Sequence, residues 1–160
     1  MLSLLARHWL TISTLFLWAI VLLAFLAPAL VALGFTELAE VLYSCYRWFC
    51  HQDPTRSFFL WGHPLALCQR DTAAFASAAL SGVLYIVGDR VRPLPRGVYL
   101  LMLAPLIADS AMQIVGLHQS TALLRAVTGG LAGAGSVWFF YPRMAAELRR
   151  ATASVKTQRF

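Results

Sequence analysis

Long apolar runs alternate with short polar stretches along the chain and predict membrane-spanning helices. The first run, residues 9–33, contains no charged side chain and is interrupted only by Pro28. At about 1.5 Å per residue it can cross a bilayer with some tilt, and it is too long for the apolar core of a cleaved signal peptide. Three further runs follow, so the predicted spans are residues 9–33, 72–88, 97–117 and 121–141.

The segment of residues 36–50 has a different pattern. Its apolar side chains recur at helical spacing, while Glu37, Glu40 and Arg47 occupy other parts of the helical wheel. A helix of this length reaches only about 22 Å, short of the roughly 30 Å hydrocarbon core, and its aromatic residues are typical of the membrane–water boundary. We therefore expect an all-α membrane protein with four transmembrane helices plus one amphipathic interfacial or half-inserted helix. It forms a single membrane domain over residues 1–160, with a loop over residues 51–71.

The composition agrees with a membrane protein. Hydrophobic residues make up 59% of the chain and charged residues 12%, and the mean hydropathy is +0.68. Soluble domains average about 45–50% apolar and about 25% charged residues. A large soluble catalytic domain is thereby excluded, and the sequence contains no standard nucleotide-binding, zinc-protease or calcium-loop motif.

The basic residues are unevenly distributed around the predicted spans. A net charge of +6 would suit nucleic acid, but most of the basic residues flank apolar runs. If both termini lie on one side, that side carries nine Lys and Arg residues and the other side four, which places both termini in the cytoplasm of a multi-pass cell-membrane protein. The basic tail, residues 142–160, is expected to contact the lipid bilayer, and nucleic acid is not an expected partner. The nine are Arg7, Arg90, Arg92, Arg96, Arg143, Arg149, Arg150, Lys156 and Arg159.

This topology gathers polar side chains at the outward end of the predicted spans. Asp109 and Gln113 are four residues apart and therefore share a helix face. An Asp near the centre of a span costs about 2.5–3.5 kcal/mol on insertion scales, so we expect Asp109 to face the bundle interior with Arg125 as its nearest partner. The set expected at this level is Cys50, His51, Arg56, Cys68, Arg70, Asp71, Asp109, Gln113 and Arg125.

Several of these residues carry a resemblance to a known family. The strings concerned are Cys50-His51-Gln52, Pro54-x-Arg56-Ser57-Phe58, Cys68-x-Arg70, Pro105 with Asp109 and Gln113, Leu124-Arg125 and Thr128-Gly129. Over about residues 43–135 the chain resembles small bacterial and archaeal integral-membrane proteins that are classed as a domain of unknown function, so the resemblance implies a membrane protein without implying an activity. The chain departs from the family pattern by reading Asp71 where a second cysteine is typical and Ser110 where a glycine follows the Asp.

One hypothesis is a metal site at the outward loop. Cys50, His51, Cys68 and Asp71 offer thiolate, imidazole and carboxylate ligands, which suit zinc or another divalent ion. In a catalytic version Asp109, supported by Gln113, acts as the base. Arg56, Arg70 and Arg125 would hold an anionic, lipid-like ligand, because guanidinium groups bind phosphate and carboxylate bidentately.

Two alternatives belong to other classes. In the first, Cys50 and Cys68 are the redox pair of a thiol–disulfide exchange with a quinone, with Cys45 as the resolving thiol. In the second, the chain is a non-enzymatic accessory subunit of a larger membrane complex, with a structural disulfide between Cys50 and Cys68. Its Gly129-xxx-Gly133 step would then serve docking, although we favour close packing inside one bundle as the explanation of that step. Bound ion, exchangeable thiols, or neither would distinguish the three.

Overall fold

The computed structural model describes residues 2–88, 92–117 and 119–157 of the chain. Arg90 and Arg159, two of the basic residues counted above, lie outside the described residues. The described part is mostly helical and holds five α-helices, one short 3-10 helix and two strands. In chain order these are α1 (Leu2–Ala32), α2 (Thr36–Tyr46), η1 (Pro54–Arg56), β1 (Ser57–Leu60), β2 (His63–Cys68), α3 (Gln69–Val87), α4 (Arg96–Ile114) and α5 (Ala122–Thr157).

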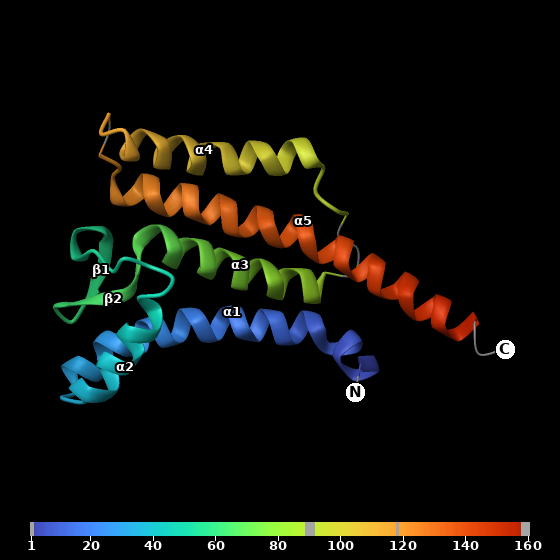
Figure 1. Cartoon of the computed structure of the whole chain (residues 1–160), viewed down its shortest axis with the longest axis horizontal. Helices are drawn as coiled ribbons and strands as arrows, with labels where there is room; N and C mark the ends of the chain where they lie inside the picture. The colour runs from blue at the N-terminus through green and yellow to red at the C-terminus, as the bar shows by residue number, and fades with distance from the viewer. Residues whose placement is uncertain (1, 89–91, 118, 158–160) are drawn as a thin grey trace.

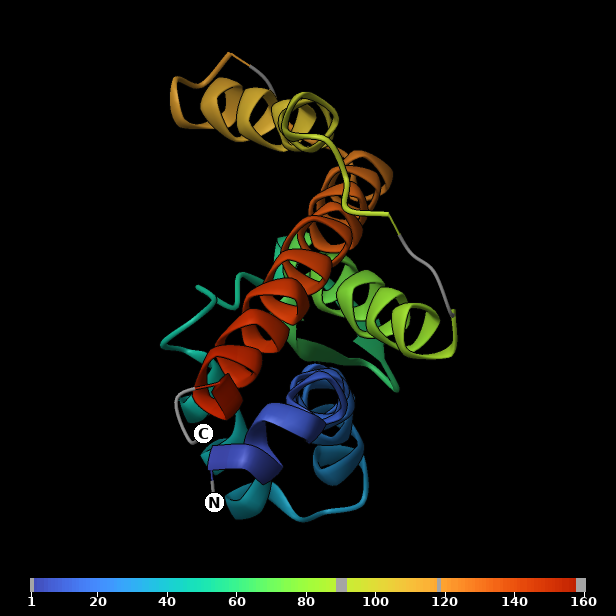
Figure 2. The same cartoon turned by 90° about the vertical axis from the view of Figure 1, so that its right-hand side faces the viewer.

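The four long helices lie side by side in the order α1, α3, α5, α4 (Figure 1). Seen along the bundle in Figure 2, α4 and α1 form opposite edges, and α5 crosses between them. α1 begins and α5 ends at one end of the bundle, while α2 and the β1–β2 hairpin lie at the other. We call this second end the hairpin end. The start of α3, the end of α4 and the start of α5 also lie there, so residues far apart in the sequence come together.

Close contact between α3 and α5 depends on two glycines. A Cβ atom at Gly129 would collide with the carbonyl oxygen of Arg70, and one at Gly133 would collide with the carbonyl oxygen of Ala74. Both carbonyls belong to α3, so the small residues of α5 let the two backbones approach one another. The Gly129–Gly133 step thus serves packing inside the bundle.

Three helices of the described chain are long and apolar enough to cross a membrane: His8–Ala32, Arg96–Ile114 and Ala122–Ala151. Their exposed side chains are largely apolar, as for Phe16 on α1 and Leu101 on α4, which suits contact with lipid. α3 is not among the three. Its first turn carries Gln69, Arg70 and Asp71, and small residues follow, so it lacks the apolar stretch that the three have.

The segment after α2 differs from the predicted one. α2 ends at Tyr46, and part of the expected loop forms an antiparallel hairpin in which Leu60 pairs with His63. The two residues of its turn, Trp61 and Gly62, both have positive φ, +50° and +81°, as a type I′ turn requires. The expectation of an all-α chain is therefore wrong here. Trp61 is an unusual residue for this backbone conformation, so the sequence does not carry the usual Asn-Gly or Asp-Gly signature.

The hairpin packs against α1 through small side chains. Ala24 and Ala27 of α1 are fully buried, and so are Ala66 and Leu67 of β2. Tyr46 closes the group from α2 by donating its hydroxyl hydrogen to the carbonyl oxygen of Ile20. This cluster fixes the position of the chain on both sides of Cys50 and Cys68.

A proline fastens the α3–α4 connection to α5. Pro142 has no backbone N–H, so the carbonyl of Trp138, four residues earlier, has no helical partner. That carbonyl accepts a hydrogen bond from the backbone N–H of Leu94 at 3.2 Å. Arg143 donates to the carbonyl oxygen of Leu94 at 2.8 Å and stacks over the Phe139 ring at 3.7 Å. The start of α4 is thereby held against α5.

Candidate functional site

Two cysteines and an aspartate meet at the hairpin end. Cys68 is the last residue of β2 and precedes α3, Asp71 lies in the first turn of α3, and Cys50 follows α2. The backbone N–H of Cys68 donates to Sγ of Cys50 at 3.2 Å, and Sγ of Cys68 donates to Oδ2 of Asp71 at 3.1 Å. The two sulfurs and a carboxylate oxygen all lie within 4.8 Å of one another. We call these three residues the thiol–carboxylate cluster.

The two thiols of this cluster have different protonation behaviour. A side-chain hydrogen bond from the Cys68 thiol to the Cys50 sulfur outweighs burial and lowers the pKa of Cys50 to about 7. The same bond raises the pKa of Cys68, and burial raises it further. Cys68 has one thiol proton, and either acceptor, the Cys50 sulfur or the Asp71 carboxylate, keeps that proton on Cys68. Near neutral pH the pair therefore consists of a partly ionised Cys50 and a protonated Cys68, and both cysteines are free.

His51 does not join the cluster. Cys50 is buried, with 6% of its surface exposed, whereas the side chain of the next residue is exposed to solvent. The four-residue ligand set expected from the sequence is thus reduced to Cys50, Cys68 and Asp71 among the described residues. Cys50 is turned into the core and His51 out to solvent, so the two adjacent side chains do not reach one point.

Gln52, which the sequence analysis treated only as part of a motif, fixes the geometry of this turn. Its φ of +53° is rare for a residue with a side chain. Its amide Nε2 donates to the carbonyl oxygens of Tyr43 at 2.7 Å and Ala66 at 3.2 Å. Gln52 therefore joins α2 to β2 and holds Cys50 beside Cys68.

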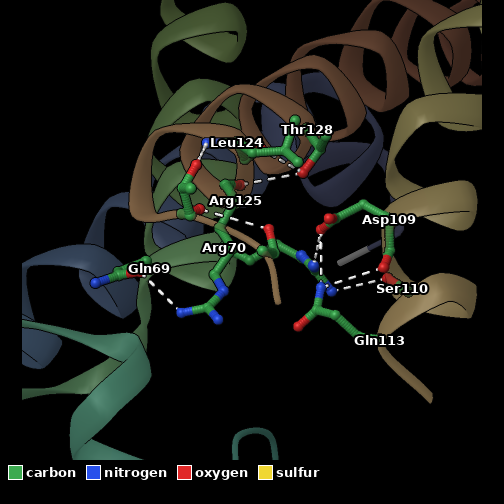
Figure 3. A network of polar contacts seen from close by, with 10 residues as sticks. Gln69, Arg70, Asp109, Ser110, Gln113, Leu124, Arg125 and Thr128 are labelled. Carbon is green, nitrogen blue, oxygen red and sulfur yellow. Dashed lines mark hydrogen bonds and ion pairs between the residues drawn. The ribbon is translucent and has the colours of Figure 1, made fainter. Parts of the chain in front are cut away.

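A buried ion pair lies deeper in the bundle. Arg70 donates through Nη2 to Oδ2 of Asp109 and through Nη1 to the Ser110 hydroxyl at 2.7 Å. Gln113 donates to the same Asp109 oxygen at 2.9 Å, and Asp109 is only 2% exposed (Figure 3). The expected face sharing of Asp109 and Gln113 is thus visible as a hydrogen bond. Asp109 Oδ1 and Arg70 Nε are buried without a partner among the described residues.

The expectation that Arg125 pairs with Asp109 is wrong. Figure 3 shows the two guanidinium groups turned apart, with Arg70 directed to Asp109 and Arg125 directed to Gln69. The cause is the close approach at Gly129, which brings the first turn of α3 against α5 and sends the Arg70 side chain toward α4. Arg125 instead donates through Nη1 to Oε1 of Gln69 at 3.2 Å.

A hollow of about 490 Å³ opens beside this network, and we call it the polar cavity. Arg56 of η1 and Arg125 of α5 both line it, with Gln113 of α4 between the buried ion pair and the hollow. The side chain of Arg56 is 54% exposed and contacts Asp53 at 3.3 Å. The polar lining is Thr55, Arg56, Gln69, Gln113, Gln119, Ser120 and Arg125.

The structure therefore divides the predicted outward set into three groups and leaves His51 outside all of them. Cys50, Cys68 and Asp71 form the thiol–carboxylate cluster, Arg70 and Asp109 form the ion pair, and the polar cavity has its own lining. Gln69 was missed at first, although it accepts from Arg125 and donates to the carbonyl of Ser57 at 3.2 Å. Its position between Cys68 and Arg70 was the only signal in the sequence. Chemically, the cluster offers metal ligands or a dithiol, and the cavity offers cationic hydrogen-bond donors.

Comparison with known proteins supports one family. An uncharacterized protein of Methanocaldococcus jannaschii is 33% identical over 126 residues, which cover 74% of this chain and 81% of that protein. An uncharacterized protein of Methanothermobacter thermautotrophicus is 33% identical over 92 residues, or 56% of this chain and 82% of that protein. No solved structure matches the chain. The model of a family described as predicted membrane proteins matches residues 50–139, from Cys50 to Phe139, so this chain belongs to the DUF2085 family of membrane proteins.

Proposed function

We propose that this membrane protein binds a divalent transition-metal ion, with zinc as the first candidate, through Cys50, Cys68 and Asp71. The observation that supports this function is the convergence of their three ligand atoms within 4.8 Å. Zinc–sulfur bonds of about 2.3 Å and zinc–oxygen bonds of about 2.1 Å place tetrahedral ligands roughly 3.5–3.8 Å apart. The cluster therefore needs only a small contraction to hold an ion.

The donor set favours zinc over magnesium or calcium. Two sulfur ligands are soft and suit zinc, whereas magnesium and calcium require oxygen ligands. Three protein ligands leave a fourth position for water or a ligand, which is the pattern of catalytic zinc sites. The backbone N–H of Cys68 supports the Cys50 sulfur from outside the set, as second-shell donors do at metal sites.

The membrane arrangement is part of the same proposal. α3 is the fourth span, in addition to the three apolar ones, and its polar first turn lies at the level of the thiol–carboxylate cluster. What supports a spanning α3 is its position in the row between α1 and α5, where neighbours cover it on both sides. Both termini are cytoplasmic because that side carries nine basic residues against four, so the hairpin end faces outward.

Elemental analysis tests the metal site. The purified protein, loaded with zinc in detergent and then desalted, is expected to keep about one zinc per chain. Cys50→Ser and Asp71→Asn should lose it, because each removes or weakens one of three ligands. Cys45→Ser is the matched control, since Cys45 is an exposed cysteine outside the cluster. Equal zinc content in Cys50→Ser and the unaltered protein would overturn the proposal.

Thiol–disulfide exchange with a quinone is the second candidate function. It is favoured by one observation, the two free thiols of Cys50 and Cys68 beside each other at the hairpin end. Two thiols would lose two protons and two electrons and form one disulfide, and the quinone would take them up as a quinol. Incubating metal-free protein with a water-soluble quinone should then convert two of its three thiols to a disulfide. A thiol count that stays at three excludes this function.

A further inference from the structure

We infer that the polar cavity is a binding site for a phosphate-type anion, held between Arg56 and Arg125. This site is separate from the thiol–carboxylate cluster, because none of the three cluster residues lines the cavity. The inference goes beyond metal binding and does not depend on it. Of the three arginines expected to hold an anion, Arg56 and Arg125 form this site and Arg70 does not.

The charges around the cavity favour an anion. The lining residues include two arginines and no carboxylate; the other polar groups are amides and hydroxyls. Arg56 contacts Asp53 at 3.3 Å, but both side chains are largely exposed, at 54% and 39%. Exposed ion pairs are worth only about 0–1 kcal/mol, so an anion with several oxygens can compete for Arg56. With Asp53 counted, the two arginines still leave the wall positive.

Arg125 has unused hydrogen-bonding capacity. Its guanidinium has five N–H donors, and the one side-chain acceptor that the structure gives it is the neutral amide oxygen of Gln69. Its Nε is buried without any partner among the described residues. Asp53 interacts with Arg125 electrostatically, but among the described residues it accepts no hydrogen bond from that guanidinium. The free donors of Arg125 can therefore bind phosphate oxygens, because such charge-assisted bonds are bidentate and short.

Arg70 is excluded from this site by its own partner. It is bound to the Asp109 carboxylate and to the Ser110 hydroxyl, so its charge is already balanced inside the bundle. Gln113 links the two regions, since it donates to Asp109 and also lines the cavity. The ion pair therefore fixes the position of Gln113 in the cavity wall. Arg125 is not part of that pair and donates to Gln69 instead (Figure 3).

The size and place of the cavity indicate the ligand class. A volume of about 490 Å³ lies in the range of small-molecule sites, roughly 300–1,000 Å³, and exceeds what a bare phosphate fills. The cavity also lies at the hairpin end, among η1, the segment after α4 and the start of α5. Two sources share the required chemistry: the phosphate of an anionic lipid headgroup and a free phosphate or phosphate ester.

Calorimetric titration in a nonionic detergent distinguishes these sources. The probes are inorganic phosphate and a short-chain phosphatidylglycerol, with phosphatidylcholine of the same chain length as the zwitterionic comparison. Adding EDTA throughout keeps the result independent of any metal. The variants are Arg56→Gln and Arg125→Gln, and the matched control is Arg47→Gln, which removes the same charge near the hairpin end but outside the cavity.

The expected result is binding of at least one anionic probe, weakened about tenfold or more in Arg56→Gln and Arg125→Gln and unchanged in Arg47→Gln. Binding of both probes or of phosphate alone assigns a free phosphate, and binding of phosphatidylglycerol alone assigns the lipid headgroup. Because Arg56 is exposed, its variant keeps the fold even if Arg125→Gln does not. The inference is overturned by no binding, by equal affinity for phosphatidylcholine, or by an Arg56→Gln affinity equal to that of Arg47→Gln.

Discussion

The guanidinium of Arg70 and the carboxylate of Asp109 form an ion pair that joins the first turn of α3 to the last two turns of α4. The two helices are not neighbours in the row, since α5 lies between them along most of its length. The side chain of Arg70 therefore crosses α5 beside Gly129, where α5 has no side chain in the way. Asp109 is buried with its charge balanced at this one point.

Breaking this pair should destabilise the protein strongly. Asp109→Leu or Arg70→Met leaves one buried group without its partner, which costs about 3–5 kcal/mol of unfolding free energy. Replacing both residues with apolar ones, Arg70→Met with Asp109→Leu, should cost less than the sum of the single changes. Unfolding in detergent, followed by circular dichroism, measures each value. Glu147→Gln is the control, since its exposed pair with Arg150 is worth about 0–1 kcal/mol. Strictly additive effects of the two single changes would contradict the coupling.

Replacing each of two adjacent glycines of α5 by alanine should affect stability differently. Gly129→Ala places a Cβ against the carbonyl oxygen of Arg70, and overpacking of this kind costs about 1–3 kcal/mol. Gly130→Ala places its Cβ in open space, so it should be neutral or slightly stabilising, because alanine favours a helix by about 1 kcal/mol. Thermal unfolding of the two variants side by side is the measurement. Equal melting temperatures would mean that α3 and α5 are not in backbone contact at this point.

Shortening the side chain of Gln52 should loosen the hairpin. Gln52→Asn tolerates the positive φ but its shorter amide no longer reaches the carbonyls of Tyr43 and Ala66. The loss of these bonds to half-buried carbonyls is expected to lower the unfolding free energy by about 1–3 kcal/mol. Gln119→Asn, at an exposed glutamine, is the control for the same chemical change. Unchanged stability of Gln52→Asn would show that the turn is held by other contacts.

The ionisation of Cys50 gives a prediction for pH. Since its folded pKa is lowered from 9.0 to about 7, its thiolate should form as pH rises through 7. The measurement is the ultraviolet thiolate absorbance of metal-free protein minus that of Cys50→Ser, recorded from acid to alkaline pH. The difference is expected to rise with a midpoint near pH 7 and to be small below pH 5. A midpoint near the ordinary value of 9.0 would mean that the Cys68 hydrogen bond does not stabilise the thiolate.

Much of the helical framework follows from the apolar runs, because uncharged runs of this length form helices in a membrane. The helices α1 and α4 lie over two such runs, and the family match agrees with a membrane protein. α5 begins with the predicted run 121–141 but continues to Thr157, so most of the predicted tail is helical. The hairpin could not be predicted, because Trp61 takes a backbone conformation that local propensity does not favour. Burial against Ala24 and Ala27 of α1 supports it instead, and that contact joins distant parts of the chain.

The candidate site shows the same limit. The spacing of Asp109 and Gln113 within one helix predicts their contact, because one helical turn fixes it. The partner of Asp109 could not be deduced in this way, since Arg70 and Arg125 both lie in the first turn of a helix that starts at the hairpin end. Which of them reaches Asp109 depends on the lateral order of the helices, and that order depends on glycine contacts between α3 and α5.

The position of α4 has a consequence for biosynthesis. Within the described residues α4 packs chiefly on α5, which follows it in the chain, and the backbone bond from Leu94 also reaches a residue of α5. During translation α4 therefore leaves the ribosome before its packing partner exists. Among the described residues, the side-chain hydrogen bonds that α4 makes with the earlier part of the chain are those from Arg70 to Asp109 and Ser110. This ion pair can thus act as a temporary tether that keeps α4 beside the growing bundle, a role that would end when α5 enters between the helices.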